Sequence, residues 1–302
     1  SPSPTNTQQP TNTPLPPTST PSTPTATPVP STTPPTPTQT PINEVIYVDD
    51  DAPSDPFPGV PDDDHTEDGT LTYPFDEIQQ AINAAFDGDT IIILDGTYTG
   101  PENRNLDWSG KQLTLQSQNG STSCIIDCEG TSNAFDLSNH ADVSIINGLT
   151  ITNGGAEGWG GGAYIDNASP LFISCVFINN SAIRGGAVHT RNSNSAFIDC
   201  VFEFNESTEM GGAVDSYNGS NTEFVNCLFS NNTCYHDVNG GGAVFIEESS
   251  IPQFTNCTFY NNSAITNLGN SIFLMRNVVA EVRFSIMWGT YSPANHISIY
   301  EP

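Results

Sequence analysis

A short glycine-rich unit recurs through the second half of the chain, and this repeat constrains the fold more than any other feature. A Gly-Gly-Ala unit occurs at 161–163, 185–187, 211–213 and 241–243, and a degenerate copy begins at Gly269. The intervals between copies are 24, 26, 30 and 28 residues. A second unit, Cys-x-Phe-x-x-Asn, lies between successive copies and begins at Cys175, Cys200, Cys227 and Cys257. Two units in fixed alternation indicate a repeat architecture.

Each repeat contains short runs of alternating apolar and polar residues, broken by Gly and Asn, and leaves no room for a crossover helix. This content and period fit one coil of a parallel β-solenoid, in which successive coils stack at the strand spacing of ~4.8 Å. We therefore predict an all-β fold, a right-handed parallel β-helix of about eight coils.

The register of the repeat predicts three ladders of identical side chains. The Phe of each unit is expected to stack inside the helix: Phe177, Phe202, Phe229 and Phe259. The four repeated Cys are expected to be buried free thiols, because parallel side chains in neighbouring coils do not converge for a disulfide. The final Asn of each unit is expected at a corner, in a left-handed conformation and bonded to the next Asn: Asn180, Asn205, Asn232 and Asn262.

Residues 42–100 are expected to form the entry to the β-helix domain, which spans 42–302. This entry would hold a strand at 45–48, an acidic loop, a helix at 75–86 and the first coil, which includes a strand at 90–94. The helix carries an apolar face at helical spacing, formed by Phe75, Ile78, Ile82, Ala85 and Phe86.

Residues 1–41 have a different composition from the rest of the chain. They include 14 Pro, 14 Thr and 5 Ser, with no charged residue. Such a segment favours polyproline II and cannot bury a core, so we predict a disordered linker that acts as a semi-stiff spacer. A spacer implies another domain before residue 1. The chain also begins without a secretion signal, so we expect a mature product or a fragment.

The net charge of −28 falls entirely on the predicted β-helix domain. This charge excludes nucleic acid as a partner and disfavours an anionic membrane surface. No run of 18 apolar residues occurs in the sequence, so we expect no direct membrane insertion.

The alternating Gly-Gly-Ala and Phe-x-x-Asn units resemble the repeats of polymorphic outer membrane proteins, within the wider pectin-lyase-like group of right-handed parallel β-helices. The entry segment, with "YVDDDAP" and "PFDEIQQAINAAFDGDTIIILDGTYTG", is similar to the start of β-helix repeat proteins secreted by environmental bacteria. The resemblance covers residues 44 to about 290, and it implies that the helix at 75–86 caps the first coil and covers an otherwise open sheet edge. It implies an extracellular or bacterial cell-surface location, including the outer membrane, but no single activity, because such helices serve as enzymes, adhesins and passenger domains.

An enzyme of this group would need catalytic side chains that the sequence supplies sparsely. The lyases use Arg or Lys as a base, and the regular coils contain only Arg184, Arg191, Arg276 and Arg283. The short Asp motifs of the glycosidases (NTD, DD, GHG) are missing from the repeat region. The best local candidates are His189 and Asp215, at equivalent places beside the Gly-Gly-Ala units, with Arg191 two residues further on. The alternative is that these residues form a solvated strand face.

The acidic loop is a candidate metal site. Its ligands would be Asp49, Asp51, Asp62, Asp64 and Asp68. Asp64-x-Thr66-x-Asp68-Gly69 matches the start of a calcium loop, although Phe75 stands where an EF-hand has its bidentate Glu. Oxygen ligands on a flexible loop favour Ca²⁺ over transition metals. The alternative is a loop that only adds solubility.

We therefore expect a secreted or cell-surface β-helix module, non-catalytic, that binds a polysaccharide or a surface protein in an adhesin-like or structural role. The alternative is a polysaccharide lyase or glycoside hydrolase of the pectin-lyase-like group. The sequence leaves the question of catalysis open.

Overall fold

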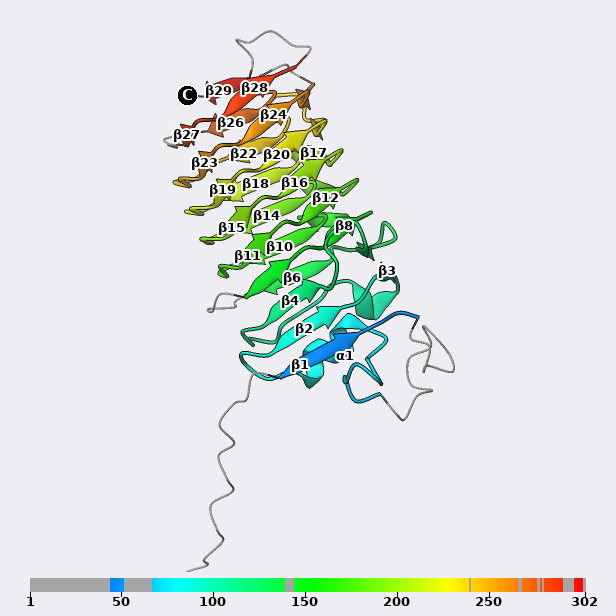
Figure 1. Ribbon diagram of the computed structural model, residues 1–302. Coiled ribbons are helices and arrows are strands. Elements are labelled where there is room, and N and C mark those ends of the chain that lie inside the picture. Colours follow the sequence, from blue (N-terminus) through cyan, green and yellow to red (C-terminus); the bar gives the residue numbers. More distant parts are fainter. Residues whose placement is uncertain are drawn as a thin grey trace, which may run out of the picture. The chain divides into compact units, whose positions relative to one another are not determined.

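The computed structural model describes residues 44–51, 67–138, 144–238, 240–265, 268–275, 278, 280–289 and 296–300. Within these residues the chain winds through stacked coils whose strands form four parallel sheets (Figure 1). The linker predicted for residues 1–41 lies outside the described residues and stays a prediction. No helix among the described residues is long and apolar enough to cross a membrane.

The four sheets are named here by their strand number. The nine-stranded sheet contains β1 (Val45–Val48), β2 (Thr90–Ile93), β4 (Thr114–Ser117), β7 (Ile145–Asn147), β11 (Leu171–Ile173), β15 (Ala196–Ile198), β19 (Glu223–Val225), β23 (Gln253–Thr255) and β27 (Glu281–Arg283). The eight-stranded sheet contains β3 (Gly96–Tyr98), β5 (Cys124–Asp127), β8 (Thr150–Thr152), β12 (Val176–Ile178), β16 (Val201–Glu203), β20 (Leu228–Ser230), β24 (Thr258–Tyr260) and β28 (Ile286–Trp288).

The other two sheets are shorter. The seven-stranded sheet contains β6 (Phe135–Ser138), β10 (Ala163–Asp166), β14 (Val188–Arg191), β18 (Val214–Tyr217), β22 (Val244–Ile246), β26 (Ile272–Met275) and β29 (Ile297–Tyr300). The five-stranded sheet, which the sequence does not predict, contains β9 (Gly155–Trp159), β13 (Ser181–Arg184), β17 (Glu206–Met210), β21 (Thr233–Cys234) and β25 (Ser263–Ala264). A complete coil visits the nine-, eight-, five- and seven-stranded sheets in that order. The predicted fold class is confirmed, with about seven turns rather than the eight expected.

The predicted aromatic stack is confirmed. Its four Phe side chains are fully buried, and successive ring centroids lie 5.2, 4.7 and 4.7 Å apart with nearly parallel planes. A second buried stack, from the nine-stranded sheet, meets the first edge to face and consists of Phe172, Phe197, Phe224 and Phe254. All seven cysteines are buried free thiols, as predicted for the four that repeat.

The asparagine ladder is confirmed as a hydrogen-bonded column, with one correction. Asn205 donates its backbone N–H and its side-chain amide to Oδ1 of Asn232, at 3.0 Å each, and Asn180 donates to Asn205 in the same way. The left-handed residue, however, is the one before each ladder Asn, for example Asn179 at φ 57° and Phe204 at φ 54°. The ladder side chains point inward and are buried, while the preceding residue makes the corner.

The expected alignment of the first Gly-Gly-Ala unit is wrong by one residue. Ala163 pairs with Val188, and not with Ala187. Gly160, rather than Gly161, is therefore the equivalent of Gly185, and both adopt a left-handed backbone, with φ 66° and 62°. The run of three glycines at 160–162 conceals this register in the sequence, because any of them satisfies the pattern.

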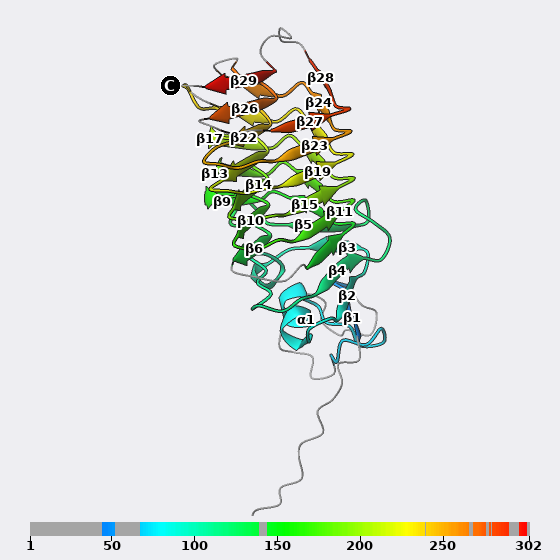
Figure 2. The same cartoon turned by 90° about the vertical axis from the view of Figure 1, so that its left-hand side faces the viewer.

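The N-terminal end is closed by a helix that is shorter than predicted. Helix α1 (Ile78–Ala84) buries Ile78, Ala81 and Ile82 and lies beside β1 and β2 (Figure 2). Phe86, expected on the apolar face, is 74% exposed because the helix has already ended. A short 3₁₀ helix, η1 (Pro101–Asn103), supplies Oδ1 of Asn103 to the N–H of Ile78 at 2.8 Å.

Candidate functional site

His189 and Asp215 form a buried pair on the seven-stranded sheet. They stand opposite each other on β14 and β18, in neighbouring coils, as expected from the sequence. Nδ1 of His189 donates to Oδ2 of Asp215 at 2.8 Å, and both side chains are fully buried. The alternative expectation of a solvated strand face is therefore wrong for both residues.

The burial results from the five-stranded sheet, which places Arg184 on the pair. Nε of Arg184 lies 2.9 Å from Oδ2 of Asp215, and its terminal nitrogen forms an ion pair with Glu247. Burial alone would lower the pKa of Arg184, but the two carboxylates raise it overall. For Glu247 burial has the opposite effect: it raises the pKa of the carboxyl group, and the positive charge of Arg184 offsets only part of that rise. One cation thus joins two carboxylates from different coils.

Aromatic rings enclose the imidazole of His189. Trp159 stacks on it with ring centroids 4.9 Å apart, and Tyr164 lies nearly parallel to it at 5.6 Å. Tyr217 lies at 6.3 Å and also accepts the Arg184 guanidinium over its ring at 5.2 Å. Nε2 of His189 is buried and has no hydrogen-bonding partner among the described residues.

This enclosure limits what the His189–Asp215 pair can do. A general base must lie within hydrogen-bonding reach of the proton that it removes. The imidazole of His189 is 0% exposed, so a substrate would first have to displace Trp159 or Arg184. Arg191, the third predicted residue, points elsewhere: its guanidinium pairs with Asp166 at 3.4 Å. In this geometry the buried His189–Asp215 pair supports the rings of Trp159 and Tyr164.

The surface above this network carries two aromatic side chains, Trp159 and Tyr164, which we call the aromatic patch. Trp159 is 38% exposed and belongs to β9, the edge strand of the five-stranded sheet. Tyr164 is half-buried, its ring centroid lies 6.2 Å from that of Trp159, and its hydroxyl donates to Asp166 at 3.5 Å. Burial and nearby carboxylates raise the pKa of Tyr164, so the hydroxyl keeps its proton at neutral pH.

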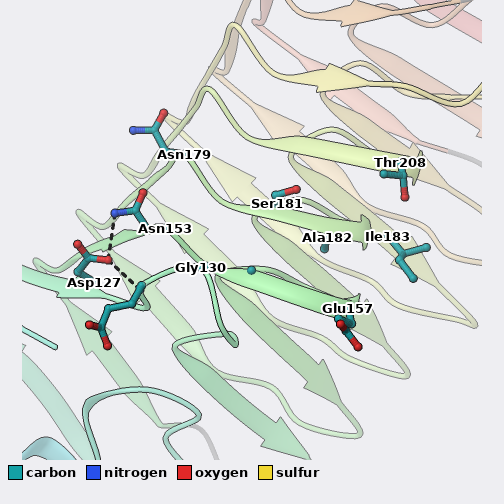
Figure 3. A pocket seen from close by; sticks show the side chains of 12 residues that line it. Asp127, Gly130, Asn153, Glu157, Asn179, Ser181, Ala182, Ile183 and Thr208 are labelled. Atoms are coloured by element: carbon teal, nitrogen blue, oxygen red, sulfur yellow. Dashed lines mark hydrogen bonds between the residues drawn. The ribbon is translucent and has the colours of Figure 1, made fainter. Parts of the chain in front are cut away.

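An open pocket of about 590 Å³ is lined by residues from the eight- and five-stranded sheets, among them Asp127, Glu157 and Ser181 (Figure 3). Its carboxylates include Asp127, whose Oδ1 accepts from the N–H of Glu129 at 2.9 Å and from the amide of Asn153 at 3.0 Å. Glu129 in turn pairs with Arg104. These groups satisfy one another at the rim, so the pocket does not gather charged side chains toward a common point.

Comparison with known proteins agrees with this architecture. Residues 160–292 match the family model described as a right-handed β-helix region. The fold is a right-handed parallel β-helix. Among solved structures it is similar to a pectin methylesterase from carrot, with 9% identity, a TM-score of 0.47 and coverage of 85% of this chain and 88% of that chain.

A second similar structure is the pectin methylesterase from Aspergillus niger, with 11% identity, a TM-score of 0.43 and coverage of 87% of this chain and 91% of that chain. No curated protein sequence matches the chain.

Two of the predicted metal ligands, Asp49 and Asp51, form one carboxylate group with Asp50, which lies between them in the sequence. Carboxylate oxygens of Asp49, Asp50 and Asp51 lie within 4.8 Å of one another. Asp68 does not join this group; its Oδ1 accepts from the N–H of Thr70 at 3.0 Å and closes a local turn. Asp62 and Asp64 lie outside the described residues.

The sequence pointed to His189 and Asp215 but not to the residues that bury them. Trp159 and Arg184 each come directly before the first left-handed glycine of a repeat, at 160 and 185. That shared position is the signal that could have placed both on one column. Glu247 directly follows β22. The strand pairing places it at the repeat position that Arg191 occupies two coils earlier.

Proposed function

We propose that this chain is a secreted or cell-surface β-helix module that binds a glycan at the aromatic patch. The observation that carries the proposal is the exposed Trp159 on an edge strand, held by stacking on the buried His189. Sugar rings present apolar C–H faces that pack on aromatic rings, and carboxylates beside the rings accept bonds from hydroxyl groups. Asp136 and Asp166 stand next to Tyr164 for that purpose.

Binding without catalysis is supported by where the charges lie. The side chains suited to acid–base work, His189 and Asp215, are beneath the aromatic rings and not on the surface. The side chains that a ligand can reach are rings, hydroxyls and carboxylates. This set resembles a binding surface, in which rigid rings supply contact area and polar groups supply orientation.

The extracellular location and the spacer at residues 1–41 are part of the same proposal. The Pro- and Thr-rich composition of residues 1–41 favours a spacer that holds the β-helix away from a neighbouring domain. The net charge of −28 suits a module that works in water and not on an anionic membrane. Protease treatment of intact cells tests the location, since a surface module is cleaved without lysis.

Replacing Trp159 with Ala is expected to weaken glycan binding at least about tenfold, roughly 1.4 kcal/mol, because the stacking surface is removed. The measurement is a glycan array with the full chain, followed by calorimetric titration of the best ligand. Tyr235→Ala is the matched control, because Tyr235 is another exposed ring, following β21 of the same sheet, with 45% exposure. Equal loss in both variants, or none in Trp159→Ala, contradicts the proposal.

The same samples address the enzyme alternative, a polysaccharide lyase or hydrolase. Neutral and acidic polysaccharides are incubated with the wild-type chain, and reducing ends and unsaturated products are measured. Turnover that disappears in His189→Gln, at a temperature where circular dichroism shows that variant folded, would replace the binding proposal with a catalytic one.

We also propose that the Asp49–Asp51 group binds Ca²⁺. Burial raises the pKa of Asp49 and of Asp50, and neighbouring carboxylates raise both further. An acid whose pKa is raised by folding stabilises the fold while protonated and loses that contribution as the pH rises through the folded-state pKa. The ionised group therefore costs stability at neutral pH, and a bound cation offsets that cost.

Millimolar Ca²⁺ is accordingly expected to raise the melting temperature at pH 7, relative to chelator, and to have less effect near about pH 4, where the carboxylates take up protons. Asp50→Asn should raise the melting temperature in chelator and reduce the Ca²⁺ effect, since Asn can still accept the bond from the N–H of Thr97. Asp199→Asn, which removes an equal charge from an exposed corner, is the control. An unchanged melting temperature on Ca²⁺ addition excludes the site.

A further inference from the structure

Asp136 stands directly beside the aromatic patch. It lies on β6, the edge strand of the seven-stranded sheet, and pairs in register with Tyr164 on β10. Neighbouring parallel strands are about 4.8 Å apart, so the Asp136 carboxylate adjoins the face of Tyr164 that is turned away from His189. Asp136 is half-buried, and its Oδ1 accepts from the hydroxyl of Ser138 at 2.5 Å.

The charge of Asp136 is not neutralised as its neighbours' charges are. Arg191 pairs with Asp166, and Arg184 pairs with Asp215 and Glu247. Among the described residues, no Lys, Arg or His forms an ion pair with Asp136. The cations close to the patch, including Arg191 beside the Tyr164 hydroxyl, are thus already matched to other carboxylates, and the charge beside Tyr164 without an ion-pair partner among the described residues is that of Asp136.

We propose that the aromatic patch selects glycans by charge, binding amino sugars more tightly than neutral sugars and neutral sugars more tightly than uronic acids, with Asp136 as the residue that sets this order. The inference rests on the proposed glycan-binding function and deepens it. It adds the chemical class of the ligand and a residue that determines specificity.

Electrostatics gives the direction and the size of the effect. A unit charge on a ligand about 5 Å from a carboxylate in water changes affinity about fourfold, favourably for an ammonium group and unfavourably for a second carboxylate. Asp136 therefore separates an amino sugar from a uronic acid by about tenfold or more. The net charge of −28 acts in the same direction over longer range and is screened by salt.

The test uses the full chain and three oligosaccharide probes of equal length: a glucosamine oligomer, a glucose oligomer and a galacturonic acid oligomer. Affinities are measured by calorimetric titration in low salt and again in high salt. The critical variant is Asp136→Asn, which keeps the shape and an acceptor for Ser138. Asp199→Asn is the control, because it makes the same change in net charge at the exposed corner between β15 and β16.

In the wild-type chain the glucosamine oligomer is expected to bind most tightly and the galacturonic acid oligomer most weakly. Asp136→Asn should reduce the affinity ratio of these two probes about tenfold, and Asp199→Asn should leave it nearly unchanged. An unchanged ratio in Asp136→Asn, or equal binding of all three probes that is lost in Trp159→Ala, overturns the charge selection alone. Failure of every probe to bind the folded chain overturns the proposed function together with this inference.

Discussion

Asn205→Asp is expected to cost the folded state more than about 3 kcal/mol at neutral pH, although it changes a single side-chain atom from nitrogen to oxygen. The amide nitrogen of Asn205 donates to the carbonyl of Phe177 at 2.9 Å and to Oδ1 of Asn232 at 3.0 Å. In the Asp variant a carboxylate oxygen would replace this donor and face two other oxygen acceptors. The carboxylate would also be a buried negative charge with no cation beside it. Removing the donors and burying the charge act in the same direction.

The measurement is urea unfolding of the wild-type chain and the variant at several pH values. The buried Asp should have a raised pKa in the folded state, so its penalty should be largest at neutral pH and smaller below about pH 4, where it is protonated in both states. Asn221→Asp, on an exposed side chain that donates to Asn194, should shift stability by less than about 0.5 kcal/mol. Equal effects at both positions would show that the buried ladder contributes nothing special.

Phe229→Ala is expected to cost about 3 to 5 kcal/mol, because it leaves a cavity in the middle of the aromatic stack. The Phe229 ring lies 4.7 Å from Phe202 on one side and 4.7 Å from Phe259 on the other. It also meets Phe224 and Phe254 edge to face, at 5.4 and 6.2 Å. Coils bonded into ladders on both sides can close such a gap only partly, so the cost should lie near the upper end of that range.

Thermal and urea unfolding measure the effect, and Phe86→Ala provides the comparison. Phe86 is 74% exposed, so the same truncation removes little buried surface there. A cost for Phe229→Ala no larger than that for Phe86→Ala would mean that the core relaxes around the missing ring.

The fold could be predicted from the sequence because the same physical demand recurs in every coil. In each repeat an inward Phe and an inward Asn have to stack on their equivalents in the next coil. These two residues therefore indicate the same strand register in every repeat. The register failed only at 160–162, where three glycines satisfy the pattern in more than one way. The second Phe stack and the five-stranded sheet went unseen. The strand at 206–210, for instance, is polar and irregular and carries no apolar alternation.

Only the part of the candidate site that follows the repeat could be predicted from the sequence. His189 and Asp215 share a repeat position and were paired correctly from it. Their burial depends on Arg184 and Trp159, which come from a sheet that no sequence pattern announced. Whether an outward side chain meets water or a neighbouring sheet is a tertiary property, and strand periodicity does not contain it.

The network around His189 is distributed over four successive coils, from Trp159 on β9 through Arg184 and Asp215 to Glu247 after β22. In the other coils of a solenoid each repeat contacts only its neighbours, so repeats there can be duplicated or deleted at little structural cost. A coil inserted between β14 and β18 would instead move His189 from Asp215 by one strand spacing, about 4.8 Å, and abolish their bond. Evolution can therefore lengthen this protein freely only outside a four-coil block, which has to be inherited as a unit.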